Sequence, residues 1–358
     1  MDSQPEILRF IFVAGIDWAW SGVGFATKVA RDRVRQVLAK YKERHIQIQI
    51  FDFSSGSIHI IERGRGVTAS IKESERQIFA PITKKLNYPR IEMSSGPSDS
   101  VYVHDGRQTM SITDVYESVF LIGDRSPETL CELSFFSHAY SDGPTLVNSY
   151  EYLRPVYKGG RLREAYAHEM NARDSFDRDP RGAKDFDLPY FNKERHKSLN
   201  HAFHRKLGRA WIWGCNDDLR VLYPLQKTFQ SPSFSWSGVD NEKVIKYRFT
   251  KEEAQDCFGT DPTGKFLPQD KSELIFSRTF GELKKYARAI LSSTYSARFA
   301  RTSKVLCLGA LPGTFANYQR PPMAITSDRK SVTRFFKTYL SVSLDDDGFG
   351  YAKFFPEQ

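Results

Sequence analysis

Eight residues near the amino terminus, Ile7 to Ala14, form an almost uninterrupted apolar run. A strand that is buried on both faces of a parallel sheet has this composition. A glycine-containing turn over residues 15–24 follows, and apolar residues then recur at helical spacing from Ala26 to Leu38. Residues Ile46 to Phe53 alternate apolar and polar side chains, which indicates a second strand, nearer a sheet edge. The unit is β-α-β, so the sequence predicts an α/β protein with a mainly parallel sheet.

Further helices and strands follow along the chain. The pattern predicts helices at 113–121, 199–207, 274–291, 295–300 and 332–340, and strands at 133–137, 210–213 and 305–309. Three longer segments, 54–110, 150–190 and 216–271, are polar or irregular and are interpreted as hairpin and loop insertions. Together these elements predict one domain over residues 1–358, a three-layer α/β/α sandwich.

Charge and cysteine content narrow the classes of partner. The chain carries 52 Lys and Arg against 43 Asp and Glu, and these charges are spread along its length without a basic arm. This pattern favours a protein or peptide partner over nucleic acid. Cys131 and Cys307 lie in apolar strand contexts, where a buried structural role is expected. We expect no metal site, no cofactor and no membrane span, and a cytoplasmic protein; the oligomeric state is not indicated.

Two residues with catalytic side chains directly follow predicted strands. His138 ends the strand at 133–137, and Cys215 follows the strand at 210–213 after a single glycine. Ligands of open α/β sheets bind outside the carboxyl ends of the strands, so the two side chains are expected to meet at one edge. An imidazole can take the proton of a thiol and produce a nucleophilic thiolate. We therefore predict Cys215 as nucleophile and His138 as base, with the N–H groups of Ala139 and Cys215 facing the oxyanion.

The residues beside Cys215 predict its surroundings. Asn216, Asp217 and Asp218 follow at once, which predicts that the strand has reached solvent and that the carboxylates raise the pKa of the thiol. Gly214 would let a substrate approach the backbone. The residues expected to line a pocket here are Asp142, Gly143, Asn216 and Asp217.

The order of these features resembles a known clan. A strand with SFFSHA at its end, a helix, and a strand with WIWGC at its end are similar to the caspase-like cysteine peptidases, which include caspases, metacaspases, legumains and clostripain-like enzymes. The stretch YSARFARTSKVLCLGALPGT is similar to the helix and strand that follow the Cys strand in bacterial relatives. The resemblance implies a caspase-like fold and a cysteine endopeptidase with a Cys-His dyad, Cys215 as nucleophile and His138 as general base. A catalytically inactive interaction module of the same fold remains an alternative.

A nucleotide-binding enzyme is a second alternative. In the turn SGVGFATK, Gly22 and Gly24 match the first two positions of a dinucleotide loop, whereas Thr27 stands at the third small position. Asp52, which closes the second strand, would then bind the ribose, or would otherwise be a surface residue.

Two other polar groups have simpler interpretations. The histidines at 196, 201 and 204 do not share one helical face, so a solvated face is expected rather than a metal site. The charged stretch 173–187 is interpreted as a solvated loop or as a flap over the cleft.

Overall fold

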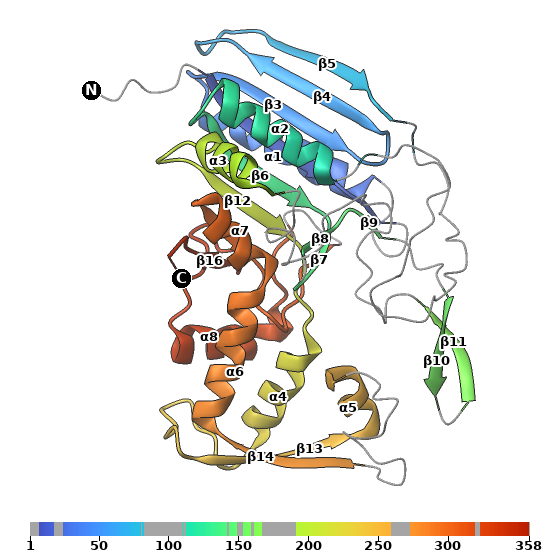
Figure 1. Ribbon diagram of the computed structural model, residues 1–358. Coiled ribbons are helices and arrows are strands. Elements are labelled where there is room, and N and C mark those ends of the chain that lie inside the picture. Colours follow the sequence, from blue (N-terminus) through green and yellow to red (C-terminus); the bar gives the residue numbers. More distant parts are fainter. Residues whose placement is uncertain are drawn as a thin grey trace.

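The computed structural model describes residues 7–17, 24–79, 81, 110, 112–141, 143–148, 153–158, 161–166, 191–258, 273–318 and 323–357. These residues form an eight-stranded sheet with helices on both faces, in the order β16-β15-β12-β6-β1-β3-β4-β5 (Figure 1). The predicted α/β class with a mostly parallel sheet is confirmed. The strands of this sheet are β1 (Ile7–Ala14), β3 (His45–Asp52), β4 (Ser57–Arg63), β5 (Ile71–Gln77), β6 (Leu130–Phe136), β12 (Arg209–Trp213), β15 (Leu306–Gly309) and β16 (Ala352–Phe354).

The centre of the sheet is parallel and its margins are antiparallel. Strand β1 pairs in parallel with β3 and β6, and β12 pairs in parallel with β6 and β15. Strands β4, β5 and β16 are antiparallel to their neighbours. Strand β3 lies nearer a sheet edge than β1, as predicted, and the hairpin of β4 and β5 continues the sheet beyond it. That hairpin was expected as an insertion after residue 53, and its outer strand is exposed along its whole length.

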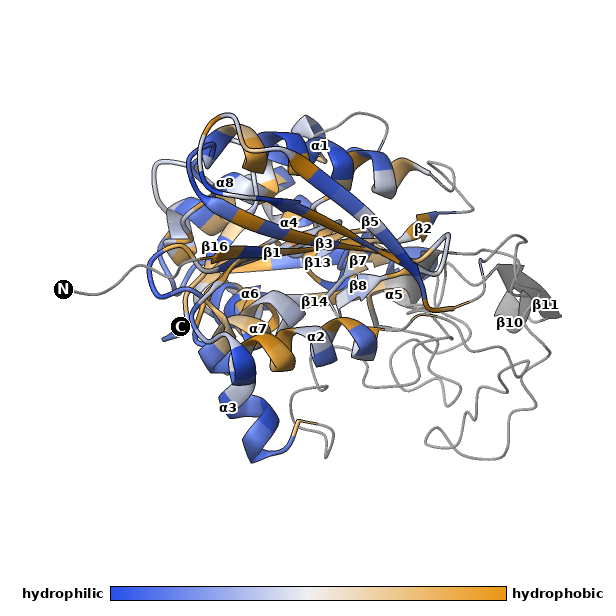
Figure 2. Cartoon of the chain, turned by 90° about the horizontal axis from the view of Figure 1, so that it is seen from above, coloured by the Kyte–Doolittle hydropathy of each residue, from blue (hydrophilic) through white to orange (hydrophobic). Residues whose placement is uncertain are grey.

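Helices cover the sheet unequally on its two faces. Helix α1 (Phe25–Lys40) packs on one face, whereas α2 (Ile112–Arg125), α3 (Lys193–Ala202) and α7 (Tyr295–Ser303) lie on the other (Figure 2). Each face has its own apolar core, because successive side chains of a strand point to opposite sides. Along β1, for example, Phe10 and Phe12 belong to the α1 side, and Ile11 and Val13 to the other.

The segment after β12 is more regular than expected. It contains α4 (Leu219–Gln230), β13 (Val244–Thr250) and α5 (Lys251–Phe258), and β13 pairs antiparallel with β14 (Glu273–Thr279). The predicted helix 274–291 is therefore wrong over its first six residues, since α6 spans Phe280–Ser293. Thr279 caps that helix and forms a capping box with Glu282, which stops the helix from extending into β14. Helix α8 (Lys330–Leu340), after the short 3-10 turn η3 (Ser327–Arg329), packs beside α4 and α6.

Three small strand pairs complete the described chain. They join β2 (Ile16–Asp17) to β9 (Val147–Asn148), β7 (His138–Tyr140) to β8 (Gly143–Thr145), and β10 (Leu153–Lys158) to β11 (Arg161–Tyr166). The charged stretch 173–187 lies outside the described residues. Among the residues that the structure does describe, no helix is long and apolar enough to cross a bilayer.

Candidate active site at the carboxyl ends of β1, β6 and β12

The carboxyl ends of β6 and β12 lie next to each other. The parallel pairing of these strands ends with Phe136 opposite Trp213. His138 lies two residues beyond the first of these positions, and Cys215 two residues beyond the second. The prediction that both residues leave the sheet at the same edge is confirmed. Adjacent parallel strands make this outcome necessary, because their carboxyl ends point the same way.

Gly214 is the point at which the two strand ends touch. A Cβ atom built on Gly214 would lie 2.7 Å from the backbone nitrogen of Ala139 and 2.9 Å from the carbonyl oxygen of Ser137. Such distances are too short for any side chain, so only glycine allows the approach. The sequence predicts that Gly214 lets a substrate approach the backbone. In the structure, Ala139 occupies the space that a side chain at position 214 would fill. The residue pairs His138-Ala139 and Gly214-Cys215 are consequently packed against each other.

Asp17 is a third polar residue at this edge, and sequence reasoning missed it. Its Oδ2 lies 2.9 Å from His138 Nε2, and both side chains are buried. Asp17 belongs to β2, just beyond the end of β1, and β1 is the other neighbour of β6. The strand-end argument that located His138 therefore applies equally to the sequence AGID after the first strand. The carboxylate therefore holds the imidazole ring in one orientation.

Tyr318 lies between the two predicted catalytic residues. Its ring stacks on the His138 imidazole with centroids 3.9 Å apart and planes inclined by 28°. Its hydroxyl oxygen accepts a hydrogen bond of 3.0 Å from the Cys215 backbone N–H. Within the described chain, the His138 ring and the Cys215 thiol make no hydrogen bond with each other. Nothing in the sequence indicates this contact, because Tyr318 is 103 residues from Cys215 along the chain.

The expectation that Cys215 is exposed is wrong. The residue is only 8% exposed and belongs to the apolar core on the α1 side of the sheet. The Ala316 backbone N–H donates to its sulfur at 3.2 Å. Burial raises the pKa of the Cys215 thiol to about 11, hydrogen bonds from Tyr318 and Ala316 oppose the rise, and Asp217 adds to it. The predicted direction of the Asp217 effect on this pKa is thus confirmed, although burial is the larger cause.

The stretch before Gly143 meets the stretch after Cys215, because Ser141 contacts both Asn216 and Asp218 through its hydroxyl. Asn216 is 3% exposed, accepts from Ser141 Oγ at 2.7 Å and is tied through its backbone to Thr314, so it joins loops rather than facing a cavity. Gly143 has φ of +121° and lies against the Tyr295 ring. Asp217 has a buried Oδ1 atom with no hydrogen-bond partner among the described residues. Asp142 lies outside the described residues.

The structure describes two of the residues proposed for nucleotide binding, Gly24 and Asp52. Gly22 lies outside the described residues, and Gly24 precedes α1 as its N-cap. Asp52 is buried, and its Oδ1 accepts from the N–H and hydroxyl of Ser54 at 2.9 and 2.6 Å. Its carboxylate therefore closes its own turn, which corrects the alternative of a surface residue.

The histidines after the second insertion are also dispersed. Helix α3 ends at Ala202, so His204 lies beyond it, and its Nδ1 accepts from the backbone N–H of Lys206 at 3.1 Å. The described residues contain no cluster of His, Cys, Asp or Glu that could hold a metal ion.

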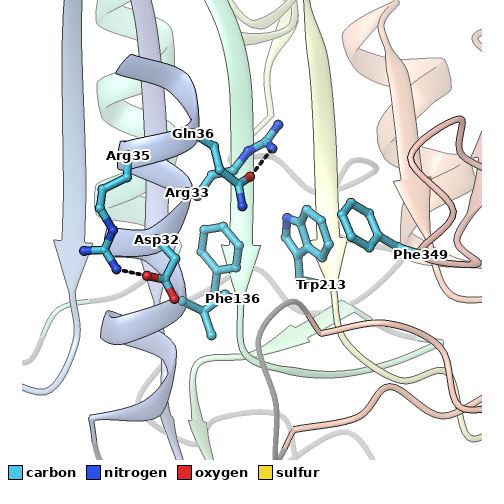
Figure 3. Close-up of a pocket in the computed structure, with 8 residues that line it drawn as sticks. Asp32, Arg33, Arg35, Gln36, Phe136, Trp213 and Phe349 are labelled. Carbon is cyan, nitrogen blue, oxygen red and sulfur yellow. Dashed lines mark hydrogen bonds and ion pairs between the residues drawn. The ribbon is translucent and has the colours of Figure 1, made fainter. Parts of the chain in front are cut away.

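A hollow of about 280 Å³ opens on the α1 side of the sheet, where Phe136, Trp213 and Phe349 face residues of α1 (Figure 3). Its charged groups are paired already. Arg35 contacts Asp32, and Arg33 binds Gln36 as well as the buried Glu132. Cys215 does not line it. The hollow is thus separate from the His138 and Cys215 groups.

No protein-family model, curated protein or solved structure matches this chain. The fold itself defines the class: an α/β protein with a mixed, mostly parallel eight-stranded sheet flanked by helices. The site is defined by three strand ends, which bring Asp17, His138 and Cys215 to one edge of that sheet.

Proposed function

We propose that this protein is a cysteine endopeptidase of the caspase-like type that acts on proteins or peptides in the cytosol, where thiols stay reduced. The His138 imidazole takes the proton of the Cys215 thiol. The thiolate then attacks the carbonyl carbon of the scissile peptide bond, and the carbonyl electron pair moves to oxygen. Collapse of this intermediate breaks the C–N bond, and the imidazolium protonates the leaving amine. Water then hydrolyses the thioester and regenerates the thiol.

One observation carries the proposal: the His138-Ala139 and Gly214-Cys215 segments pack directly on each other at the carboxyl edge of the sheet. A base and a nucleophile on adjacent parallel strands, at the edge where open α/β sheets bind ligands, are the arrangement that acyl transfer requires. The Cys215 N–H emerges at the same point and supplies one donor for the oxyanion, and the Ala139 N–H, which adjoins Gly214, is the candidate second donor.

Asp17 gives the proposal independent support. A carboxylate 2.9 Å from one imidazole nitrogen holds the ring in one orientation and stabilises the imidazolium that forms after proton transfer from Cys215. Burying the Asp17 and His138 side chains costs free energy, because both groups must be desolvated. A catalytic role would explain why the protein keeps this pair at the sheet edge.

The inactive interaction module is the second candidate, and the state of Cys215 favours it. The thiol is buried and its pKa lies near 11, so the thiolate is rare at neutral pH in the arrangement described. In that case the fold would present its surface to a partner, and Asp17, His138 and Cys215 would have a structural role only.

Cleavage of a peptide library separates the two candidates. Wild-type protein and the variants Cys215→Ala, His138→Ala and Asp17→Asn are incubated with peptides of defined ends, and new termini are identified by mass spectrometry. Because Tyr318 occupies the Cys215 N–H, Tyr318→Ala is included as well. We expect cleavage that is lost in Cys215→Ala, falls about 100-fold or more in His138→Ala, and falls less in Asp17→Asn.

Cys257→Ala is the matched control for loss of a buried thiol, since Cys257 is 2% exposed and lies in α5, where its thiol donates to the Leu219 carbonyl at 3.3 Å. It should cleave like wild type. Cleavage that persists in Cys215→Ala, or a library left intact by both wild type and Tyr318→Ala, would contradict the peptidase and leave the interaction module.

A further inference from the structure

The segment that carries Tyr318 folds back over the end of β12. After β15, residues 314–316 form antiparallel bridges with Asn216 on one side and with Ile325 on the other. The Asn216 N–H donates to the Thr314 carbonyl at 2.9 Å, and the Asn317 N–H donates to the Ala324 carbonyl at 2.8 Å. The backbone before Tyr318 is therefore held on both sides, which fixes where its side chain can reach.

The Tyr318 ring covers one face of the proposed base. Its centroid lies 3.9 Å from that of the His138 imidazole, which is stacking distance. Asp17 holds the Nε2 edge of the same imidazole. Two of the approaches to His138 are thus occupied by other side chains of this protein.

The Tyr318 hydroxyl occupies the proposed oxyanion donor. It accepts the Cys215 N–H at 3.0 Å, and it also bonds to the Cys215 thiol, which has the Ala316 N–H at 3.2 Å as a further donor. A substrate carbonyl oxygen would need that same N–H to be polarised. One N–H cannot serve the hydroxyl and a carbonyl with full strength at the same time, so the two oxygens compete for one place.

We propose that Tyr318 is an intramolecular stopper, meaning a side chain of the protein itself that blocks the Cys215 site. The arrangement described is then the closed state of that site. This inference rests on the proposed function, because it assigns the regulation of the same site. Substrate enters only when the Tyr318 side chain leaves the space between His138 and Cys215. The apparent reactivity of Cys215 is then its intrinsic reactivity multiplied by the fraction of molecules with Tyr318 displaced.

Alkylation of Cys215 by iodoacetamide tests the stopper without a known substrate. The rate at Cys215 is followed at pH 7.5 by peptide mapping in wild type, Tyr318→Ala, His138→Ala and the double variant. If Tyr318 is displaced in fewer than about one wild-type molecule in ten, Tyr318→Ala should raise the rate of Cys215 alkylation at least about tenfold. Tyr318→Phe keeps the ring on His138 and removes the hydroxyl, so its rate should fall between wild type and Tyr318→Ala.

The alkylation rates of these proteins separate this inference from the proposed function. A faster rate in Tyr318→Ala that slows again when His138 is also replaced supports both. A faster rate that ignores His138 supports the stopper and contradicts the dyad. An unchanged or slower rate in Tyr318→Ala overturns the stopper, and a slower rate in Tyr318→Phe would make the hydroxyl an activating group instead.

Two controls exclude loosening of the fold as the cause. Cys307 in β15 is 0% exposed and should stay unlabelled in every folded variant. Tyr339→Ala removes a tyrosine whose hydroxyl donates to the Ser235 carbonyl, remote from β6 and β12, and should leave the Cys215 rate at the wild-type value. Labelling of Cys307 in Tyr318→Ala would mean that faster Cys215 alkylation came from unfolding, and Tyr318→Phe would then decide the test.

Discussion

At the scale of single residues, Asp217, two positions after the nucleophile candidate Cys215, carries an energetic penalty. Its Oδ1 atom is buried without a hydrogen-bond partner among the described residues. Burial raises the pKa of the Asp217 carboxyl to about 6, Asp218 adds to the rise, and Arg329 partly offsets it. The ionised form is thus less stable in the folded protein than in the unfolded chain.

We expect Asp217→Asn to stabilise the protein at neutral pH. A carboxyl whose pKa is raised on folding favours the folded state fully below its unfolded pKa, near 4, and this contribution is lost as pH rises through about 6. The amide side chain at position 217 of the variant does not ionise, so the variant does not lose this stability at high pH. Its free energy of unfolding should exceed the wild-type value by about 1–2 kcal/mol at pH 8. The difference should vanish near pH 4. Urea unfolding at both pH values measures it, and a wild type that is the more stable at pH 8 would contradict the assignment.

At the scale of elements, one buried carboxylate ties α1 and two central strands together. Glu132 of β6 is 1% exposed and binds Arg33 of α1 at 2.9 and 2.7 Å and Arg209 of β12 at 3.1 and 3.0 Å. Burial alone would raise the pKa of Glu132, but the charges and hydrogen bonds of Arg33, together with Arg209, hold it below its ordinary value. Ser134 Oγ donates a further bond of 2.8 Å.

Glu132→Gln should be strongly destabilising above pH 5, because it leaves two partly buried arginines without their counter-charge. The expected loss in free energy of unfolding is about 3 kcal/mol at pH 7. A depressed pKa contributes stability above the unfolded value, near 4, and this contribution is lost as pH falls through the lower folded pKa. Wild type and variant should therefore converge in acid.

Asp346→Asn is the matched control for that measurement, because it removes an exposed ion pair with Lys353, 2.6 Å long. It should cost less than about 0.5 kcal/mol. If Glu132→Gln and Asp346→Asn lost the same free energy of unfolding, the burial of Glu132 would add nothing to the stabilisation by its ion pairs.

At the scale of the whole molecule, one apolar core continues from the sheet into the region after β12. The cluster that contains Leu133 of β6 also contains Tyr247 and Phe249 of β13 and Phe335 of α8. Phe280 of α6 packs on the Phe335 ring edge to face. This continuity favours a single cooperative unit, which is how residues 1–358 are predicted to fold.

We expect one unfolding transition, and Phe335→Ala should shift all of it. The side chain is fully buried, so truncation should cost about 3–5 kcal/mol. Urea unfolding followed by far-ultraviolet circular dichroism and by tryptophan fluorescence should give the same midpoint in wild type and, lowered equally, in the variant. Two separated transitions, with only one shifted by Phe335→Ala, would divide the chain into two domains.

Local patterns by themselves determined most of the elements, because apolar spacing reflects which faces are buried. They predicted β1, α1, β6 and β12, and with them the edge at which His138 and Cys215 emerge, since neighbouring parallel strands end together. They also contained two signals that were overlooked: Asp17 just beyond β1, and the capping box at Thr279 that separates β14 from α6.

Only the tertiary structure decided the state of the site. Cys215 has a polar sequence after it, yet it is buried because residues 314–318 return about 100 positions later to cover it. The stacking of Tyr318 on His138 and the close approach of Ala139 to Gly214 depend on which strands become neighbours. Burial, hydrogen bonding and the pKa values that follow from them are set by groups distant in the chain, so no local pattern can encode them.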